Sequence, residues 1–431
     1  MDLSFWAATD VGRKREANED NFLVDKKLSL FVVADGMGGH ASGEVASDIA
    51  VHEFRNAIDA NRDMIDRYVK GDGTVRPPDI LAMLEQAVQT ACFAIFDRGQ
   101  AEPEKRGMGT TTSALLIAGD RGFIAHVGDS RIYLVRRGQV VQLTEDHSLI
   151  NELIKRGKLT KEGIDSSPYK SYKNAVTRAV GVYERVQTDT IDFEILPGDQ
   201  FLLCSDGLHA YLTDQKTIDL LAEEDITSAP KRFVALANEG GGHDNITAVV
   251  VRVDGTPAGA PATAADDRAE ELQRKVDVLK QMPLFRHLTY REIIRVLNVT
   301  EVKEFPPGAN FIKEGTYGEE LYILLKGKVR VHKNDAFITY LLPGSHIGEM
   351  ALVDRIPRSA SATAEDASRL LILRRREFYE IVRKDPTLSV KLLWSFVQVL
   401  AERLRKTTAE LSGARLEAHA QDLTDDVLFD E

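Results

Sequence analysis

Residues 28–47 read LSLFVVADGMGGHASGEVAS, and this stretch decides the fold of the first half of the chain. Its first part is an apolar run that ends in Asp35-Gly36, a pattern typical of a strand that stops at a turn. After the glycines, apolar residues from Gly43 to Ile58 recur at a mostly helical spacing. The stretch therefore predicts a strand, a glycine-rich turn and a long helix in direct succession.

Similar apolar runs follow along the chain. A second amphipathic helix is predicted where Leu84, Val88 and Ile95 share one face, with Cys92 beside it. Further strand candidates are TTSALLIA, GFIAHVGD, RIYLVRRG, QFLLCSD and NITAVVVRV. Many strands with two long early helices predict an α+β fold, in which helices flank a β-sandwich in an αββα arrangement.

The composition is that of a globular protein. The chain has 431 residues, of which 43% are hydrophobic, and a formal net charge of −12. This charge indicates no nucleic-acid partner and no anionic membrane surface. We find no run near the ~20 apolar residues of a membrane span and no secretory signal. Cys92 and Cys204 lie inside apolar runs, which indicates buried, reduced thiols and a cytoplasmic location.

A change of composition divides the chain. Residues 254–267, DGTPAGAPATAADD, are typical of a linker, and a charged helix is expected over Arg268–Gln281. The predicted organisation is a first domain over 1–253, a linker and connecting helix over 254–282, a second domain over 283–411 and an acidic tail over 412–431, expected to be mobile. Frequent turn signals predict that the second domain is a small β jelly roll flanked by helices.

Aspartates mark strand ends in the first domain. Asp35, Asp129 and Asp206 follow apolar runs, whereas Asp20 and Asp244 precede them. In antiparallel sheets the end of one strand lies beside the start of its neighbour, so these acids can converge on one edge. Carboxylates gathered there would repel each other unless cations lay among them, and oxygen ligands favour Mg²⁺ or Mn²⁺. The alternative is that each Asp-Gly or Gly-Asp is only a turn.

The ordered motifs RKREANED, VVADGMGGHASGEVAS, GMGTT, AHVGDSRIYL, LTEDHS, LLCSDGL and GGHDNITAVVV carry a family resemblance. They resemble the bacterial branch of the metal-dependent, type 2C (PPM family) protein serine/threonine phosphatases over residues 1–253. The resemblance implies a β-sandwich flanked by helices and the hydrolysis of phosphoserine and phosphothreonine in phosphoprotein substrates.

The resemblance also implies roles for single residues. The implied metal ligands are Glu19, Asp20, Asp35, Gly36, Asp129, Asp206 and Asp244. Asp35 would bridge two Mn²⁺ or Mg²⁺ ions, and Asp129 with Asp206 would offer a third position. Arg15 would hold the substrate phosphate and, with Asp35 and Asp206, form the catalytic set. Many eukaryotic members have His after the Asp-Gly; Met37 stands there, which leaves the general acid open. Residues 146–175 resemble the mobile flap beside the active site.

The second domain carries another resemblance. GSHIGEMALVDRIPRSASATA resembles the phosphate-binding cassette of cyclic-nucleotide-binding domains, and Glu349 precedes Arg358 by nine residues, the family interval. The implied nucleotide-binding residues are Gly348, Glu349, Met350, Ala351, Arg358, Ser359, Ala360, Thr407 and Thr408. The last two lie in LAERLRKTTAEL, which resembles the dimer helix of the bacterial catabolite activator protein. This favours cAMP over cGMP and a homodimer through Ser389–Leu411; the alternative is that this helix only packs on its own domain.

These features leave three candidate functions. The first is a protein phosphatase regulated by a cyclic nucleotide. The second is an active phosphatase whose C-terminal domain is a non-sensing docking or dimerisation module. The third is a transcription regulator, against which the acidic balance argues and for which we find no helix-turn-helix after Leu411.

Overall fold

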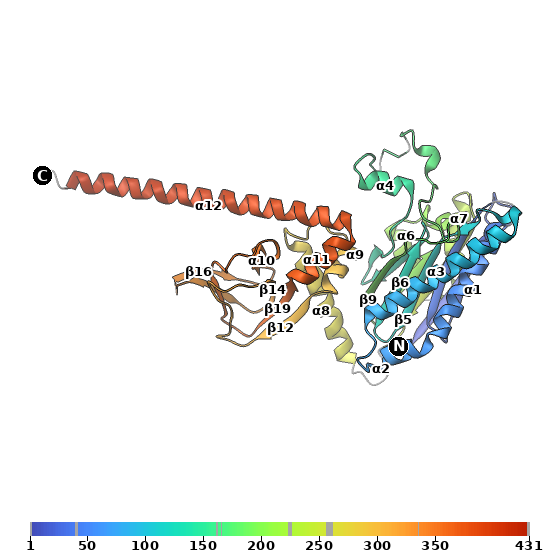
Figure 1. Ribbon diagram of the computed structural model, residues 1–431, viewed down its shortest axis with the longest axis horizontal. Helices are drawn as coiled ribbons and strands as arrows, with labels where there is room; N and C mark the ends of the chain where they lie inside the picture. Colours follow the sequence, from blue (N-terminus) through green and yellow to red (C-terminus); the bar gives the residue numbers. More distant parts are fainter. Residues whose placement is uncertain are drawn as a thin grey trace. The chain divides into compact units, whose positions relative to one another are not determined.

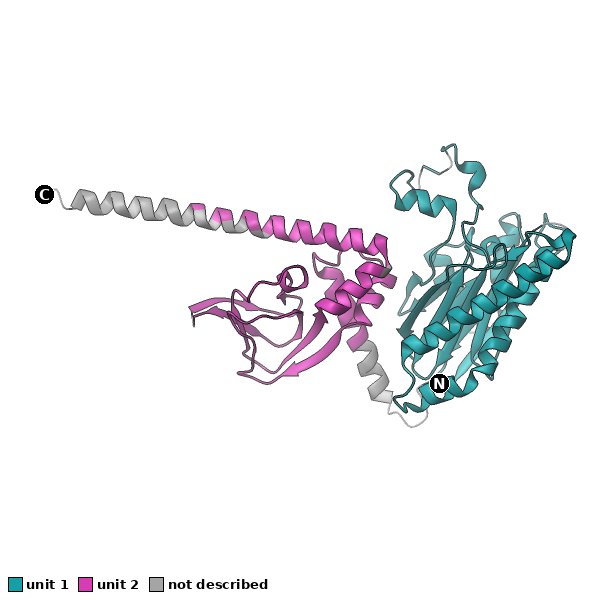
Figure 2. Cartoon of the chain, viewed as in Figure 1, with its two compact units in different colours: residues 1–269 teal, residues 270–431 magenta. Residues whose placement is uncertain are grey.

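A computed structural model describes residues 2–428 except 39–41, 161–162, 165, 223–225, 256–261 and 335; for 262–270, 384, 403, 406, 407, 410, 411 and 413–428 it describes the backbone alone. The chain divides into two compact units, Met1–Ala269 and Glu270–Glu431 (Figures 1 and 2). Each unit has its own sheets and its own core.

The first unit is an αββα sandwich, as the sequence predicted. One sheet has the order β1-β11-β10-β7-β8 and the other runs β2-β3-β5-β6-β9, with β4 beside β3. The strands are β1 (Leu3–Asp10), β2 (Asp20–Asp25), β3 (Leu30–Met37), β4 (Gly109–Thr110), β5 (Thr112–Ala118), β6 (Arg121–Val127), β7 (Arg131–Arg136), β8 (Gln139–Gln142), β9 (Asp189–Glu194), β10 (Gln200–Cys204) and β11 (Ile246–Val253). The helices are α1 (Ser42–Ala60), α2 (Arg62–Lys70), α3 (Pro77–Ala101), α4 (Leu149–Lys155), α5 (Asp206–His209), α6 (Asp214–Leu221) and α7 (Ala229–Glu239).

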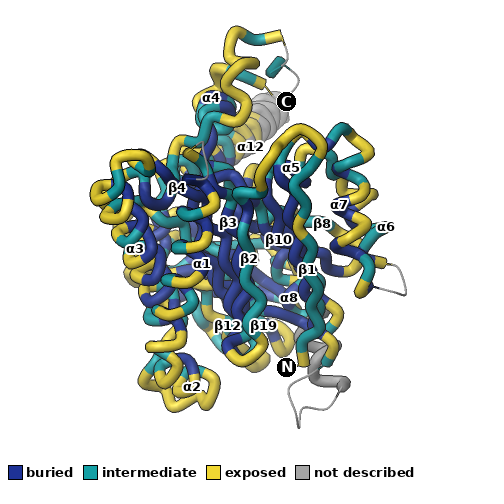
Figure 3. The backbone as a smooth tube through the Cα atoms, turned by 90° about the vertical axis from the view of Figure 1, so that its right-hand side faces the viewer, coloured by how far each residue is buried: buried dark blue, intermediate teal, exposed yellow. Residues whose placement is uncertain are grey.

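Residues 30–34 of β3 are buried on both faces, which explains why this part of the strand is continuously apolar. On one face, Leu30 and Val32 join the core cluster that α1 and α3 cover. On the other face, the Phe31 ring contacts the Phe5 ring of β1 in the opposite sheet, with centroids 5.5 Å apart. Alternate residues of one strand therefore build two different layers. Figure 3 shows these buried strands among helices whose outer turns are exposed.

Helix α3 corrects one reading of the sequence. It has 25 residues and, by length and composition, is the single helix among the described residues that could cross a membrane. Its apolar residues Leu84, Val88 and Ile95 are fully buried in the core that α3 shares with α1 and its sheet. The sequence holds no continuous apolar run here, because polar residues such as Gln86 and Gln89 interrupt it.

The second unit is a β jelly roll flanked by helices. Its two four-stranded sheets have the orders β12-β19-β14-β17 and β13-β18-β15-β16. The elements are α8 (Ala262–Gln281), α9 (Tyr290–Leu297), β12 (Glu301–Phe305), β13 (Asn310–Ile312), β14 (Glu320–Lys326), β15 (Val329–Lys333), β16 (Ala336–Leu341), β17 (His346–Ile347), α10 (Met350–Val353), β18 (Ser361–Ala364), β19 (Ser368–Arg374), α11 (Arg375–Lys384) and α12 (Pro386–Leu428). Tyr322, Leu324 and Ile372 lie in the core between the sheets.

Two helix boundaries differ from the predicted ones. The backbone of α8 is helical from Ala262, so the end of the predicted linker belongs to the helix; residues 256–261 lie outside the described part. The backbone of α12 is helical to Leu428, where a mobile tail was expected after Leu411. Both segments are rich in Ala and acidic residues, and Ala has the highest helix propensity.

Helix α12 carries apolar residues on two neighbouring faces. Leu392 and Phe396 are buried, and the Phe396 ring contacts Phe378 of α11. Leu393 and Val397, one residue further in each case, are exposed by 53% and 58%. Neighbouring residues on a helix point about 100° apart, so one set packs on the domain while the other faces solvent.

Candidate active site and ligand cradle

Sheet register brings the predicted aspartates together. Asp20 on β2 lies directly opposite Asp35 on β3 in the antiparallel ladder. Asp206 follows β10 and opens α5, and Asp244 precedes β11, the neighbour of β10. Asp129 lies in the turn between β6 and β7. Asp35 lies close enough to four other aspartates for their charges to act on its carboxylate: Asp20, Asp206, Asp129 and Asp244. The five acids therefore form one cluster.

The electrostatics of this cluster are unfavourable for ionised carboxylates. Burial, and then the charge of Asp20, raise the pKa of Asp35 well above its usual value. Burial raises the pKa of Asp20 to about 7, although hydrogen bonds from Thr247 and Ser205 act against it. Burial and the charge of Asp206 raise the pKa of Asp129 to about 7, and burial with the charge of Asp244 raises that of Asp206 to about 6. The protein alone therefore leaves this negative charge uncompensated.

Two buried oxygens in the cluster have no protein partner. Asp20 Oδ2 accepts hydrogen bonds from Ser205 Oγ and Thr247 Oγ1, both at 2.7 Å, while Asp20 Oδ1 has none. Asp206 Oδ1 is buried and unpartnered in the same way. Within the described residues, no three His, Cys, Asp or Glu side chains form a ready-made metal group. Oriented carboxylates that need further ligands fit hard cations such as Mg²⁺ and Mn²⁺, which keep several waters.

Glu19 and Gly36 lie beside this cluster in a close backbone approach. The Gly43 amide, in the first turn of α1, donates to Glu19 Oε1 at 3.2 Å. A Cβ at Gly36 would stand 2.1 Å from the Gly43 carbonyl oxygen and 2.6 Å from that of Glu19. Only glycine therefore lets β3, the Glu19 loop and α1 meet here, and this contact orients the Glu19 carboxylate.

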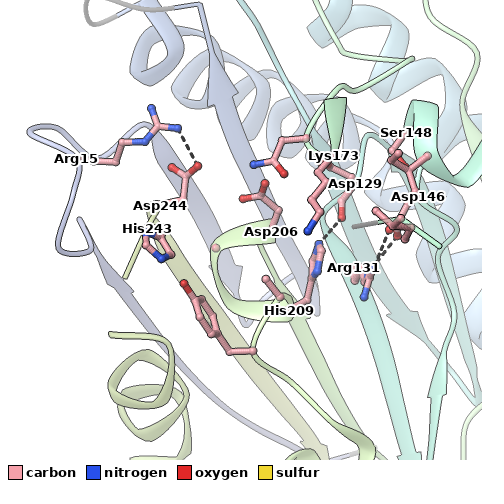
Figure 4. Close-up of a pocket in the computed structure, with 16 residues that line it drawn as sticks. Arg15, Asp129, Arg131, Asp146, Ser148, Lys173, Asp206, His209, His243 and Asp244 are labelled. Atoms are coloured by element: carbon pink, nitrogen blue, oxygen red, sulfur yellow. Dashed lines mark hydrogen bonds and ion pairs between the residues drawn. The ribbon is translucent and has the colours of Figure 1, made fainter. Parts of the chain in front are cut away.

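Arg15 lines the same cleft as Asp129, Asp206 and Asp244, which has a volume of about 670 Å³. Its guanidinium donates to Asp244 Oδ2 at 2.8 Å, and its side chain is 48% exposed. This hydrogen bond raises the pKa of Arg15, so the side chain stays charged. In Figure 4, Asp206 lies in the middle of the cleft. Arg15 and Asp244 lie to one side of it, and Asp129 lies to the other side. The forked cation therefore stands at the edge of the carboxylate-lined cleft.

The structure also shows a hydrogen-bond network around Arg131 that was not predicted from the sequence. Arg131 donates to both carboxylate oxygens of Asp146, at 2.9 and 2.6 Å, and to the Tyr133 hydroxyl. His209 Nε2 lies 3.0 Å from the Asp129 carbonyl oxygen, and burial lowers the pKa of His209 to about 3. The sequence did hold a signal for these residues, because Arg131 lies in the motif AHVGDSRIYL and Asp146 lies in the motif LTEDHS.

The segment predicted as a flap reaches this cleft. Ser148, Ile164, Lys173 and Asn174 line it together with the aspartates. The segment is attached at its base, where His147 N donates to the Gly128 carbonyl at 2.8 Å and Ser148 bridges to Val176. Side chains of this segment can therefore contact whatever occupies the cleft.

In the second unit, the predicted cradle is built around α10. Glu349 precedes α10 and is 1% exposed, and Ala351 is also buried. The Arg358 side chain is 8% exposed, whereas Met350 and Ser359 are exposed and Ala360 is half-buried. The backbone at Arg358 is fixed to the opposite loop, because its amide donates to Thr316 O and its carbonyl accepts from Gly315 N, both at 2.8 Å.

The two threonines predicted to reach the nucleotide lie on α12. The Thr408 hydroxyl donates to the Leu404 carbonyl of its own helix at 2.8 Å. The side chain of Thr407 lies outside the described residues. A role for either threonine at the nucleotide stays a prediction.

The two units match different family models. Residues 12–239 match Protein phosphatase 2C, and residues 302–385 match the Cyclic nucleotide-binding domain. The serine/threonine protein phosphatase PstP of Mycobacterium tuberculosis is 34% identical over 298 residues, which cover 65% of this chain and 54% of PstP. The serine/threonine phosphatase stp of Listeria monocytogenes is 36% identical over 259 residues, covering 59% and 98%. The chain thus spans about half the length of PstP.

Solved structures agree with this match. The crystal structure of M. tuberculosis PstP/Ppp has a TM-score of 0.51 at 34% identity, covering 59% of this chain and 99% of that chain. The PstP catalytic domain in complex with 2 manganese ions has a TM-score of 0.50 at the same identity and coverage. The matched model spans more than half of the sequence, and its motifs form one carboxylate-lined cleft. The chain, which carries a cyclic nucleotide-binding domain after its first unit, therefore belongs to the protein phosphatase 2C family.

Proposed function

We propose that the chain is a metal-dependent protein phosphatase that hydrolyses phosphoserine and phosphothreonine in proteins. The observation that carries the proposal is the pair of buried, unpartnered oxygens, Asp20 Oδ1 and Asp206 Oδ1, in a five-aspartate cluster beside an open cleft. The phosphatase relatives, and the manganese ions in the PstP catalytic domain, support the same chemistry.

Each residue of the cluster has a proposed task. Asp35, Asp206 and Asp244, with the Gly36 carbonyl, would hold two Mn²⁺ or Mg²⁺ ions. Glu19 and Asp20 would orient metal-bound waters, and Asp129 with Asp206 would hold a third ion. When bound, the metal ions lower the pKa of a water and stabilise negative charge on the phosphoryl oxygens. Ser205 and Thr247 fix the Asp20 carboxylate so that its other oxygen faces the cluster.

Arg15 is proposed to bind the substrate phosphate. Its exposed guanidinium pairs with Asp244, which is itself a proposed metal ligand. A cation bound at Asp244 would compete for that carboxylate and leave Arg15 donors for the phosphate. In the metal-free protein, the pair with Asp244 holds the Arg15 side chain in the cleft.

We further propose that the second unit binds a cyclic nucleotide, with cAMP favoured over cGMP, and that binding regulates the phosphatase. The support is the arrangement of the cradle, in which Glu349 and Arg358 are buried side chains at either end of one cassette. Arg358 would contact the cyclic phosphate, and Glu349 would accept from the ribose hydroxyl. The second candidate is a docking or dimerisation module that binds no nucleotide.

The exposed row of α12 supports a homodimer through Ser389–Leu411. The row comprises Val390, Leu393, Val397, Leu400 and Leu404, which are between 37% and 69% exposed. Its alternating spacing of three and four residues is the heptad pattern of a two-helix coiled coil. An adjacent face of the helix packs on the domain, so the row is available to a second copy of the same helix.

One experiment separates the leading function from the alternative. Full-length protein would hydrolyse a phosphothreonine peptide in Mn²⁺ with and without cAMP or cGMP, beside Arg358→Ala. We expect hydrolysis that chelation abolishes and that Mn²⁺ restores. A nucleotide that changes kcat or KM in the wild type but not in Arg358→Ala supports regulation. If neither nucleotide changes the phosphatase activity and neither binds saturably, the result supports the docking module instead.

A further inference from the structure

Among the residues predicted to bind the nucleotide, Arg358 is the one with a positive charge, and it already has an anionic neighbour. Its Nη2 donates to the Glu320 carbonyl oxygen at 2.8 Å and to Glu320 Oε2 at 3.3 Å, and Nη1 donates to the Gly348 carbonyl oxygen at 3.3 Å. The Arg358 side chain is 8% exposed and that of Glu320 is 32% exposed. The ion pair therefore lies at the rim of the cradle, with the arginine inside and the carboxylate partly in solvent.

The position of the guanidinium is tightly defined. A Cβ added at Gly318 would stand 2.5 Å from Arg358 Nε and Nη2, and one added at Gly348 would stand 2.5 Å from Nη1. The guanidinium thus lies in a slot between two glycines, one before β14 and one before α10. It cannot move far from Glu320 while it stays in this slot.

We propose that the Glu320 carboxylate competes with the cyclic phosphate for Arg358 and so lowers the affinity of the cradle for nucleotide. The inference rests on the proposed cyclic-nucleotide function. Glu320 would set the nucleotide concentration at which the cradle fills, without contacting the base or the ribose.

The Glu320 carboxylate and the cyclic phosphate are both anions that would bind the same guanidinium. A cyclic phosphate carries one negative charge and binds arginine best through two parallel donors. Nη2, one of those donors, is shared between two oxygens of Glu320. With phosphate bound, either the carboxylate leaves or two anions face each other across one guanidinium. Its partial exposure lets the carboxylate turn into solvent, where high dielectric keeps the cost of separation modest.

The Glu320 carboxylate also accepts a hydrogen bond from a second donor. Glu320 Oε2 accepts from the Glu319 amide at 3.0 Å. A glutamine at position 320 can accept from the same amide and from Arg358 through its side-chain oxygen. Glu320→Gln therefore removes the charge while keeping the size and the hydrogen-bond acceptor.

Glu319 provides the matched control. It is the neighbouring residue, its side chain is exposed, and the Arg358 guanidinium donates to Glu320 and Gly348. Glu319→Gln changes the net charge of the cradle rim by the same amount. A general electrostatic effect on an anionic ligand would be equal in both variants, whereas competition at Arg358 would appear in one.

The test is calorimetric titration of full-length wild type, Glu320→Gln and Glu319→Gln with cAMP and with cGMP. We expect Glu320→Gln to bind the preferred nucleotide roughly 3- to 10-fold more tightly, the range of a partly exposed charge pair. Glu319→Gln should stay within about twofold of the wild type.

The outcomes separate the inference from the function on which it rests. If the wild type binds and Glu320→Gln binds equally or more weakly, Glu320 is not a competitor and the inference fails alone. An equal gain in both variants also overturns it, because the cause would be net charge. If none of the three proteins binds either nucleotide, the proposed sensing function fails and takes the inference with it. Thermal unfolding without nucleotide checks that each variant is folded.

Discussion

Asp20 and Asp35 face each other across the β2–β3 ladder, so two carboxylates occupy adjoining strands at a single sheet position. Ser205 and Thr247, from the other sheet, donate to one oxygen of Asp20 and leave its second oxygen unpartnered. Both sheets of the sandwich therefore contribute to the orientation of this pair. The proposed metal ions would be held between the sheets rather than on one loop.

Asp206→Asn should reduce phosphopeptide turnover by roughly 100-fold or more, because it removes a charged ligand shared by the first and third proposed metal positions. Turnover measured against Mn²⁺ concentration checks this. Asp129→Ala should mainly raise the Mn²⁺ concentration for half-maximal activity, since the third ion is expected to be weakly held. Wild-type turnover of Asp206→Asn at limiting Mn²⁺ would contradict the ligand assignment.

Arg15→Ala should raise KM for a phosphothreonine peptide by about tenfold, because it removes a charge-assisted contact at a half-exposed site. Arg15→Lys should recover only part of this loss, since an ammonium group lacks the planar fork. Lys14→Ala, an exposed neighbour with the same charge, is the control and should leave KM within about twofold. Equal effects of Lys14→Ala and Arg15→Ala would assign the loss to general charge.

Metal-free protein should lose stability as the pH rises from about 4 to 7. The pKa values of Asp20 and Asp129 are raised to about 7, that of Asp206 to about 6, and that of Asp35 is well above its usual value. In this window the folded state holds more protons than the unfolded state, so the free energy of unfolding falls with pH. His209, with its pKa lowered to about 3, opposes this by one proton up to its unfolded pKa, about 6.5.

Thermal unfolding in a chelator and in Mn²⁺, at pH 5 and pH 7.5, measures this effect. We expect Mn²⁺ to raise Tm more at pH 7.5, because the ion compensates carboxylates that are then ionised. An equal Mn²⁺ effect at both pH values would show that the acids are already ionised at pH 5. The cluster would then be less desolvated than its burial indicates.

Arg358→Ala should weaken cyclic-nucleotide binding by roughly 100-fold or more, since a buried charged contact is worth a few kcal/mol and ~1.4 kcal/mol is tenfold. Calorimetry on the full-length protein measures it. Ser359→Ala should matter less, because Ser359 is exposed in the absence of ligand. Unchanged affinity in Arg358→Ala would place the nucleotide elsewhere or remove it from the function.

Val397→Lys should shift the protein towards monomer in sedimentation velocity experiments, because it places a charge in the exposed heptad row of α12. Ala409→Lys is the matched control: it adds the same side chain at an exposed position of the same helix, outside the row. A wild type that stays monomeric at all concentrations rules out the dimer. Equal sedimentation of both variants rules out this row as its interface.

The sequence was most informative where a residue's role follows from its place in a strand. Asp35 and Asp206 end apolar runs and Asp244 begins one, and antiparallel pairing then brings them to one edge. The Arg131–Asp146 pair was not predicted, because nothing in the order of residues fixes which acid a buried arginine meets. Likewise, Leu392 and Leu393 look equivalent on a helix until the position of the domain surface is known.

The close approach at Gly36 has a consequence for reading natural variants of this chain. A single added carbon at position 36 would meet the backbone of Gly43 and Glu19, and one at position 43 would lie 2.5 Å from Glu19 Oε1. Alanine at position 43 would push the Glu19 carboxylate aside, and alanine at position 36 would force the backbones of Gly43 and Glu19 away from β3, while every proposed acidic ligand stays in the sequence. A homologue that keeps all the acidic residues can therefore still be inactive. Gly36 and Gly43 should be checked together with the acids when a homologue is assigned as an enzyme.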